Sequence, residues 1–321
     1  MTVGKKALKI VFMGTPGFAV PSLEILISNG YNVVGVVTVA DKPAGRGYKL
    51  QESEVKKSAV KHGIKVMQPT DLKDSEFIAD LNSLGTNLIV VVAFRKMPKE
   101  VWGLPELGTF NLHGSILPNY RGAAPLNWAL INGEKETGVT TFFLDEKIDT
   151  GELIDHAKIK IGKNHTVGDV HDVLMEVGAK LVLKTVQSIE KGEVKAIPQS
   201  EVNVKTEIKK APKIFKATCE VSWGKSGNMV HNLIRGLSPY PAAFSTLSFP
   251  NGKKMKMKLF KSEYSDGLGE QGSIETDQKT FLKVYCGDGA VNIIELQPEG
   301  KKRMKTTDFL RGKDLTGCCF I

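Results

Sequence analysis

The regular alternation of apolar runs with helical patterns is the feature that most constrains the fold of this chain. Short apolar runs, typical of buried strands, cover residues 8–13, 33–39, 64–67, 88–94, 109–113 and 139–144. Helical patterns lie between them at residues 21–28, 52–62, 75–84 and 123–131, and a longer apolar stripe follows at residues 165–189. Strands that alternate with helices predict an α/β fold with a doubly wound, mostly parallel sheet.

The second part of the chain has a different pattern. Residues 192–212 are polar, lack a clear period and carry glycine and proline, which predicts a linker. A helical pattern at residues 224–237 then precedes short β-type runs at residues 243–249, 255–260, 281–285 and 290–296. We therefore predict a first domain at residues 1–191, a linker at 192–212 and a small C-terminal β domain at 213–321.

A pair of polar side chains marks the end of the fifth predicted strand. Asn111 and His113 are two residues apart, so they share one face of the strand, and Gly114 lets the chain leave the sheet. Open parallel sheets bind their ligands at the carboxyl ends of their strands. An amide and an imidazole there can donate hydrogen bonds to a carbonyl oxygen that becomes negative, and the histidine can move a proton near neutral pH.

Asp149 supplies a carboxylate to the same candidate site. It follows the apolar run at residues 138–145, so we expect it at the same edge of a parallel sheet. A carboxylate there would favour the protonated form of His113 or accept the proton that an attacking amine loses. An isolated Asn-x-His is often structural and Asp-Thr-Gly is often a plain turn, but the combination beside a Gly/Pro-rich loop favours a catalytic site.

The chain resembles a known family at these residues and beyond them. Ser-Ile-Leu-Pro-Asn-Tyr-Arg-Gly-Ala-Ala-Pro at 115–125, with Asn-x-His before it and Ile-Asp-Thr-Gly-Glu at 148–152, resembles the signature of the folate-dependent formyltransferases. Residues 10–16, the loop at 41–47 and the segment Ile-Arg-Gly-Leu-Ser-Pro-Tyr-Pro-Ala at 234–242 resemble the methionyl-tRNA formyltransferase family in particular. The central signature indicates the chemistry, whereas the loop and the C-terminal segment indicate the substrate.

The resemblance implies a reaction and a set of binding residues. The formyl group of 10-formyltetrahydrofolate would pass to the α-amino group of methionine on initiator tRNA, with Asn111, His113 and Asp149 as catalytic residues and no metal. The folate would contact two segments, represented by Ser115, Ile116, Leu117, Pro118, Phe94, Arg95 and Met97. Phe-Arg-Lys-Met-Pro at residues 94–98 departs from the Tyr-Gly-containing version common in this family, and Ala40 stands where the family often carries proline. The resemblance also implies a Rossmann-like first domain and an OB-like barrel at the C-terminus, where periodicity alone predicts only a small β domain.

The charge of the chain is consistent with an RNA partner. The net charge is +9, and residues 206–321 hold 19 Lys and Arg against 12 Asp and Glu. Basic residues gather in a turn-rich loop at 40–51 and in two clusters of the C-terminal domain. In one cluster, the lysines of residues 253–258 alternate partly with Met255, Met257 and Leu259, which predicts a strand with one lysine-rich face and one apolar face. The predicted tRNA contacts are Lys42, Arg46, Lys49, Lys253, Lys254, Lys302 and Arg303. The alternatives are a solvated lysine-rich surface and an ordinary flexible loop.

Several classes of protein are disfavoured. The four cysteines lack zinc-ligand spacing, and Gly14-Thr15-Pro16-Gly17 lacks the spacing of a dinucleotide site. Apolar runs fall short of the ~20 residues of a membrane span. We expect a cytoplasmic, monomeric enzyme. The alternatives are a folate-dependent formyltransferase acting on a small amine, such as glycinamide ribonucleotide or an amino sugar, and an RNA-binding protein with a decayed catalytic domain.

Overall fold

The computed structural model describes residues 7–44, 49–204 and 207–321, and its chain packs into two compact units. The first unit comprises Met1–Arg121, Gly138–Ile159 and Asp172–Lys209, and the second comprises Gly122–Thr137, Lys160–His171 and Lys210–Ile321. Two short segments of the predicted first domain therefore pack with the C-terminal residues. The boundaries at 1–191, 192–212 and 213–321 stay a prediction about which parts fold independently.

The first unit is built on a seven-stranded sheet in the order β10-β9-β7-β6-β1-β2-β5. The strands are β1 (Lys9–Gly14), β2 (Asn32–Val37), β5 (Val66–Met67), β6 (Leu88–Val92), β7 (Thr109–His113), β9 (Glu136–Phe143) and β10 (Leu153–Lys160). Five neighbouring strands of this sheet run parallel to one another, namely β7, β6, β1, β2 and β5. The predicted doubly wound, mostly parallel sheet is confirmed.

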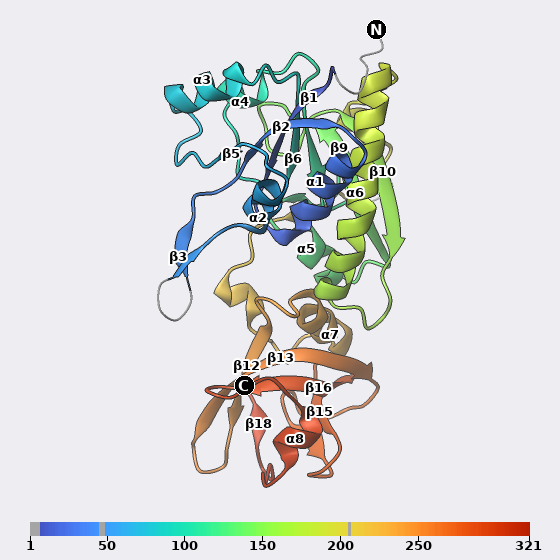
Figure 1. Cartoon of the computed structure of the whole chain (residues 1–321). Coiled ribbons are helices and arrows are strands. Elements are labelled where there is room, and N and C mark those ends of the chain that lie inside the picture. The colour runs from blue at the N-terminus through green and yellow to red at the C-terminus, as the bar shows by residue number, and fades with distance from the viewer. Residues whose placement is uncertain (1–6, 45–48, 205–206) are drawn as a thin grey trace. The chain divides into compact units, whose positions relative to one another are not determined.

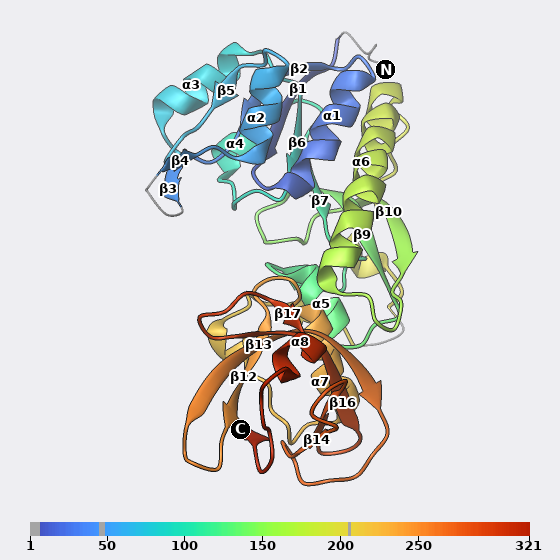
Figure 2. The same ribbon diagram turned by 60° about the horizontal axis from the view of Figure 1, so that its bottom comes forward.

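Helices cover both faces of this sheet. They are α1 (Val20–Ser28), α2 (Glu54–Lys61), α3 (Ser75–Ser83), α4 (Lys99–Trp102) and α6 (Val167–Lys191). α3 and α4 pack against the face that carries Val11 and Ile89, whereas α1 and α6 lie over the opposite face (Figures 1 and 2). Ser53 and Asp74 begin α2 and α3, because their side chains accept hydrogen bonds from the otherwise unpaired N–H groups of Lys56 and Glu76.

Two features of this unit differ from the sequence prediction. β9 runs antiparallel to β7, with Phe110 opposite Phe143 and His113 opposite Thr140, where a parallel strand was predicted. An apolar run predicts a strand but carries no information on its direction, which depends on the partner it meets. β10 was not predicted, although its polar and apolar residues alternate, because it lacks the continuous apolar run that marks the other strands and its side chains are at most half-buried.

The loop at residues 40–51 contains regular structure where the sequence predicted none. Its arms form an antiparallel pair, β3 (Lys42–Ala44) and β4 (Lys49–Gln51), with Lys42 opposite Gln51. The Asp41 carboxylate at the base of the pair accepts hydrogen bonds from Lys56 and from the Gln68 amide, whose nitrogen is 2.8 Å from Oδ1. These contacts attach the hairpin to α2 and to the chain after β5.

The second unit contains a near-closed antiparallel barrel in the order β14-β15-β16-β13-β12-β18 (Figure 2). Its strands are β12 (Ala243–Ser248), β13 (Lys254–Ser265), β14 (Ile274–Thr276), β15 (Leu282–Tyr285), β16 (Ala290–Pro298), β17 (Met304–Lys305) and β18 (Cys319–Phe320). The sheet closes because the Phe320 N–H donates to the Gly272 carbonyl at 2.8 Å, next to β14. The OB-like barrel is thus confirmed as a near-closed antiparallel barrel.

Short elements complete the second unit. They are α5 (Pro125–Ile131), α7 (Gly227–Gly236), α8 (Thr306–Leu310) and the two-residue strands β8 (Arg121–Gly122) and β11 (Lys210–Ala211), the first residue of β8 belonging to the first unit. α7 packs on the barrel through Val230 and Ile234, in the same apolar core as Trp223. The Trp223 indole donates to the Ser245 hydroxyl at 2.9 Å, so its one polar atom is satisfied inside the core. Among the described residues, no helix is long and apolar enough to cross a membrane.

Candidate active site

Strand β7 positions the first two predicted catalytic residues. It spans Thr109–His113, as predicted, and ends next to the carboxyl end of β6, where Leu112 pairs with Val92. Asn111 is half-buried and His113 is buried. The two side chains lie on the same face because they are two positions apart on one strand.

The hydrogen bond of His113 identifies which ring nitrogen can exchange a proton. Its Nε2 lies 2.8 Å from the backbone carbonyl oxygen of Tyr120. A carbonyl oxygen only accepts, so Nε2 carries a hydrogen and Nδ1 is the atom left to gain or lose a proton. The Phe142 ring meets the imidazole edge to face, with 6.4 Å between ring centroids, and fills the space beside it.

Asp149 faces Nδ1 of this histidine. Its Oδ2 lies 3.8 Å from Nδ1, which is longer than a hydrogen bond and within reach of a charge pair when the imidazole is protonated. The two side chains are only 7% and 14% exposed, so solvent screens this interaction weakly. Asp149 also adopts a left-handed backbone conformation with φ of 56°. Few residues adopt that conformation, and Asp and Asn are among those that do most readily.

The path by which Asp149 reaches His113 differs from the sequence prediction. Because β9 is antiparallel to β7, it ends beside Phe110, at the opposite end of β7 from His113. The loop at residues 144–152 must therefore return along the sheet to bring the carboxylate back. The expectation that Asp149 lies at the exit edge of a parallel strand was wrong, although the structure brings the two side chains together.

Gln199 holds this returning loop in place. Its side-chain amide donates to the backbone carbonyls of Asp149 and Gly151, at 3.0 and 2.8 Å. Its carbonyl oxygen accepts from Arg121, whose Nε is 3.0 Å away. Gly151 is required here, since a Cβ at this position would lie 1.8 Å from the Phe143 carbonyl oxygen. Sequence reasoning missed Gln199, because a single glutamine in a polar segment gives no periodic signal.

The turn predicted to lie along the folate is tied to β9 by its own hydrogen bonds. The Ser115 hydroxyl, fully buried, donates to the Asn119 carbonyl at 2.6 Å. Thr140 donates to the Ser115 carbonyl at 2.7 Å and accepts from the Leu117 N–H at 3.2 Å. Leu117 and Pro118 are buried and Ile116 is half-buried. These contacts give the turn a fixed shape next to His113.

The second segment predicted to bind folate follows β6. Arg95 donates to the carbonyls of Thr70 and Pro69 at 2.8 and 2.6 Å, and its guanidinium carbon lies 5.9 Å from the Phe94 ring centroid. Met97 is buried in the apolar core that includes Val101. Arg95 and Met97 also line a cavity of about 520 Å³ together with residues 70–73, 96, 98–100, 102 and 146.

The predicted tRNA contacts fall in both units. Lys42 is exposed on β3 and Lys49 belongs to β4, whereas Arg46 lies outside the described residues. In the second unit, Lys253 and Lys254 at the start of β13 are exposed, as is Lys302 in the turn after β16. The turn before β13 and the turn after β16 lie at the same end of this strand pair, because the two strands are antiparallel and Met257 is opposite Pro298.

Arg303 is less available than its neighbours. It forms an ion pair with Glu295, and its guanidinium carbon lies 4.4 Å from the Phe260 ring centroid. The predicted two faces of the strand at residues 254–259 are confirmed. Met257 and Leu259 point into the core, and Lys254 and Lys258 on the other face are exposed.

Within residues 7–44, 49–204 and 207–321, no group of three or more His, Cys, Asp or Glu side chains lies close enough together to hold a metal ion.

Comparison with solved structures supports the fold. The chain is similar to a sugar 3N-formyl transferase, WlaRD, with a TM-score of 0.65, 22% identity and coverage of 92% of this chain and 99% of the other. It is also similar to HypX from Aquifex aeolicus in complex with tetrahydrofolic acid, with a TM-score of 0.62, 20% identity and coverage of 97% of this chain and 48% of the other. At these identities the likeness concerns the fold alone.

Sequence comparison identifies the family. Residues 8–186 match the model of the formyl transferase family, and residues 213–314 match that of the formyl transferase C-terminal domain. A methionyl-tRNA formyltransferase of Bacteroides fragilis is 53% identical over 314 residues, which cover 97% of both chains. One of Flavobacterium johnsoniae is 48% identical over 309 residues, covering 95% of this chain and 96% of the relative. This chain therefore belongs to the formyl transferase family and, within it, to the methionyl-tRNA formyltransferases.

Proposed function

We propose that this enzyme transfers the formyl group of 10-formyltetrahydrofolate to the α-amino group of methionine on initiator tRNA, with Asn111, His113 and Asp149 as its catalytic residues. The observation that carries the assignment of the site is the buried approach of the Asp149 carboxylate to Nδ1 of His113, at 3.8 Å. The assignment of the substrate is supported by relatives of 53% and 48% identity that are named methionyl-tRNA formyltransferase.

The proposed reaction begins with attack of the methionine amine on the formyl carbon. The carbonyl oxygen becomes an oxyanion, which the Asn111 amide and the Nδ1–H of protonated His113 stabilise by hydrogen bonds. The Asp149 carboxylate lies 3.8 Å from Nδ1, where its negative charge faces the hydrogen-bond donor. The Tyr120 carbonyl occupies Nε2, so the ring presents only Nδ1 to the substrate.

Proton transfers balance the reaction. The attacking nitrogen loses a proton, which Asp149 accepts directly or through a water molecule, and the N10 atom of the folate takes up a proton as its bond to the formyl carbon breaks. The products are the formylated amine and tetrahydrofolate. These steps need no nucleophilic side chain.

The substrates are assigned to different parts of the chain. The folate is proposed to lie along the turn at residues 115–118, with its pterin against residues 94–98. The tRNA is proposed to contact the β3–β4 hairpin and the basic turns of the barrel. We also propose that the enzyme is monomeric and cytoplasmic. These two proposals, and the roles of the predicted domains, are based on the sequence and on the family.

A direct assay tests the function. We expect that incubation with methionylated initiator tRNA and 10-formyltetrahydrofolate yields formylmethionyl-tRNA, detected by mass spectrometry after hydrolysis. Glycinamide ribonucleotide and an amino-sugar nucleotide serve as control amines. Formylation of a control amine without formylation of the tRNA would assign the enzyme to a different substrate.

Gln199→Ala is expected to lower kcat roughly 10- to 100-fold, because a displacement of about 1 Å in a catalytic group has an effect of that size. The substitution removes the two hydrogen bonds that hold the main chain on either side of Thr150, without touching the Asp149 carboxylate. Ser200→Ala, at an exposed neighbour, is the matched control. Steady-state kinetics of both variants check the result, and an unchanged kcat in Gln199→Ala would show that other contacts suffice to hold the loop.

Arg46→Ala is expected to lower kcat/KM for methionyl-tRNA while leaving the affinity for the formyl donor unchanged. A lost guanidinium contact with a base costs ~1–3 kcal/mol, so the reduction is roughly 10- to 100-fold. Arg46→Lys is expected to restore only part of it, since a point charge cannot replace a planar fork. Kinetics with tRNA and titration with the folate separate the two effects. Equal tRNA efficiency in all three proteins would exclude Arg46 from tRNA recognition.

A further inference from the structure

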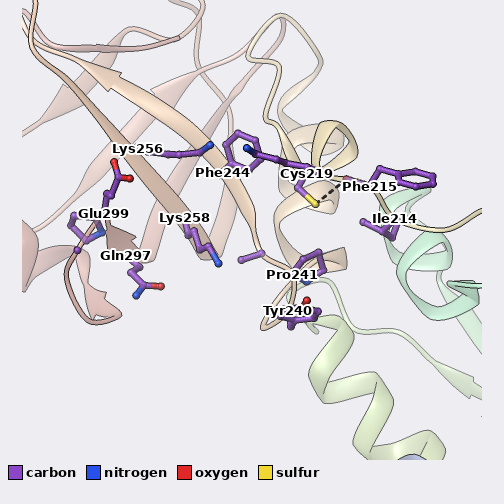
Figure 3. Close-up of a pocket in the computed structure, with 14 residues that line it drawn as sticks. Ile214, Phe215, Cys219, Tyr240, Pro241, Phe244, Lys256, Lys258, Gln297 and Glu299 are labelled. Atoms are coloured by element: carbon purple, nitrogen blue, oxygen red, sulfur yellow. Dashed lines mark hydrogen bonds between the residues drawn. The ribbon is translucent and has the colours of Figure 1, made fainter. Parts of the chain in front are cut away.

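The second unit carries a cavity that the proposed reaction does not use. Its volume is about 570 Å³, within the range of roughly 300–1,000 Å³ that is usual for small-molecule sites. It lies between the segment before η3 (Lys216–Cys219), the turn after α7, and the outer faces of β12, β13 and β16 (Figure 3). The lining residues that matter here are Phe215, Lys216, Tyr240, Phe244, Lys256 and Lys258.

Two of its aromatic side chains are unusually exposed. Tyr240 is 81% exposed and Phe215 is 62% exposed, whereas a globular chain normally buries most of such a ring. Tyr240 lies between Pro239 and Pro241, whose fixed φ angles restrict the backbone on both sides of the ring. An exposed ring on a stiff backbone loses little conformational freedom when a flat ligand stacks on it.

Positive charge lines the same cavity. Lys256 and Lys258 extend from the outer face of β13, towards Phe244 and towards the turn with Tyr240 and Pro241 respectively (Figure 3). The Lys256 ammonium lies 4.0 Å from the Phe244 ring centroid. Lys216 adds a third cation, and Glu299 is the acidic residue among the lining side chains, so the cavity has a net positive charge. Lys258 is exposed, so its ammonium is available to an anion, whereas Lys256 is half-buried against Phe244.

We propose that this cavity binds one unstacked nucleotide of the RNA substrate, with its base against Tyr240 and its phosphate near Lys258 and Lys216. A nucleotide combines a flat ring with an adjacent negative charge, which is the combination that these side chains match. A purely apolar peptide would leave the lysines unused, and an inorganic anion would leave the rings exposed. The inference rests on the proposed function, since it assigns a further contact to the same RNA.

The thiol in the wall of the cavity does not suggest covalent chemistry. Burial raises the pKa of Cys219, and its sulfur donates to the Phe215 carbonyl at 3.4 Å. A protonated thiol is a poor nucleophile. The cavity is therefore a binding site, in which stacking and charge select the ligand.

The test compares substitutions at exposed apolar side chains of the second unit. Tyr240→Ala is expected to weaken binding of unacylated initiator tRNA roughly 10-fold, the usual scale for one lost stacking contact. Tyr240→Phe keeps the ring and is expected to bind as the wild type does. Leu268→Ala, at a side chain that is 91% exposed and outside the cavity, is the matched control. Fluorescence anisotropy with labelled tRNA measures Kd without any need for turnover.

A second arm tests the charge. Lys258→Ala is expected to reduce the slope of log Kd against log salt by about one, as one phosphate contact is lost. Tyr240→Ala is expected to leave this slope unchanged, because a stacking contact releases no counterions. Tyr240→Ala with the wild-type Kd would overturn the nucleotide site, even where the wild type formylates methionyl-tRNA. Weakened binding by Tyr240→Ala in a protein that fails to formylate would overturn the proposed function and keep the RNA site.

Discussion

His113→Ala is expected to lower kcat roughly 10²-fold or more, the usual scale for the loss of one donor to a developing oxyanion. The substitution removes the imidazole whose Nδ1 faces Asp149 and whose Nε2 donates to the Tyr120 carbonyl. Asn111→Ala is expected to be similarly severe, because its amide lies on the same face of β7. Both residues lie at the end of β7, and the apolar residues beside them supply the core packing of this strand. Both variants are therefore expected to fold.

Single-turnover kinetics and thermal denaturation check this prediction together. His156→Ala, which removes an exposed histidine from β10, is the matched control and is expected to keep its rate. The tRNA affinity of all variants is expected to stay at the wild-type value, since the site acts on the reaction rather than on binding. Folded His113→Ala protein with a near-normal rate would refute the proposed mechanism.

Asp149→Asn is expected to lower kcat by a similar factor, on the order of 10², because the catalytic residues act as a unit. Asparagine has the size of aspartate and tolerates the left-handed backbone at φ of 56°, so the loop is expected to keep its shape. Gln199 binds the main chain of this loop, and its hydrogen bonds survive the change. The variant therefore removes the negative charge beside Nδ1 while the main-chain contacts of the loop with Gln199 stay in place.

Glu152→Gln is the control for Asp149→Asn, since it removes an exposed carboxylate from the same loop. The double variant with His113→Ala separates a joint role from two independent ones. We expect it to be hardly slower than either single variant, because each single change already disables the pair. Multiplicative losses in the double variant would mean that Asp149 acts without His113.

Much of the first unit could be predicted from the sequence. The strand with Asn111 and His113 has the predicted bounds, Thr109–His113, because a short, mostly apolar run that ends at Gly114 is typical of a buried strand. The parallel central strands follow from their alternation with helices. The β12 and β13 strands were predicted from short β-type runs, and the lysine face of β13 follows from its period of two.

Other features could not be predicted in the same way. β9 was predicted as a strand, but its antiparallel direction depends on its pairing with β7. Asp149 was predicted in the site, but it reaches His113 through a returning loop. Hydrogen bonds from Gln199 hold this loop, and Gln199 is 50 and 48 residues away in sequence from the two residues that it binds, Asp149 and Gly151. The cavity beside Tyr240 combines side chains from η3, the turn after α7 and three strands, which are far apart in sequence.

The sequence by itself therefore determined the order of the elements, the doubly wound sheet, the pair on β7 and the positive charge of the C-terminal part. These properties depend on local periodicity and composition, which each segment carries regardless of its neighbours. The tertiary structure alone decided the direction of β9, the approach of Asp149 to Nδ1, the role of Gln199 and the existence of the cavity. Those depend on hydrogen bonds and packing between distant segments, whose free energy is gained only when the whole unit folds.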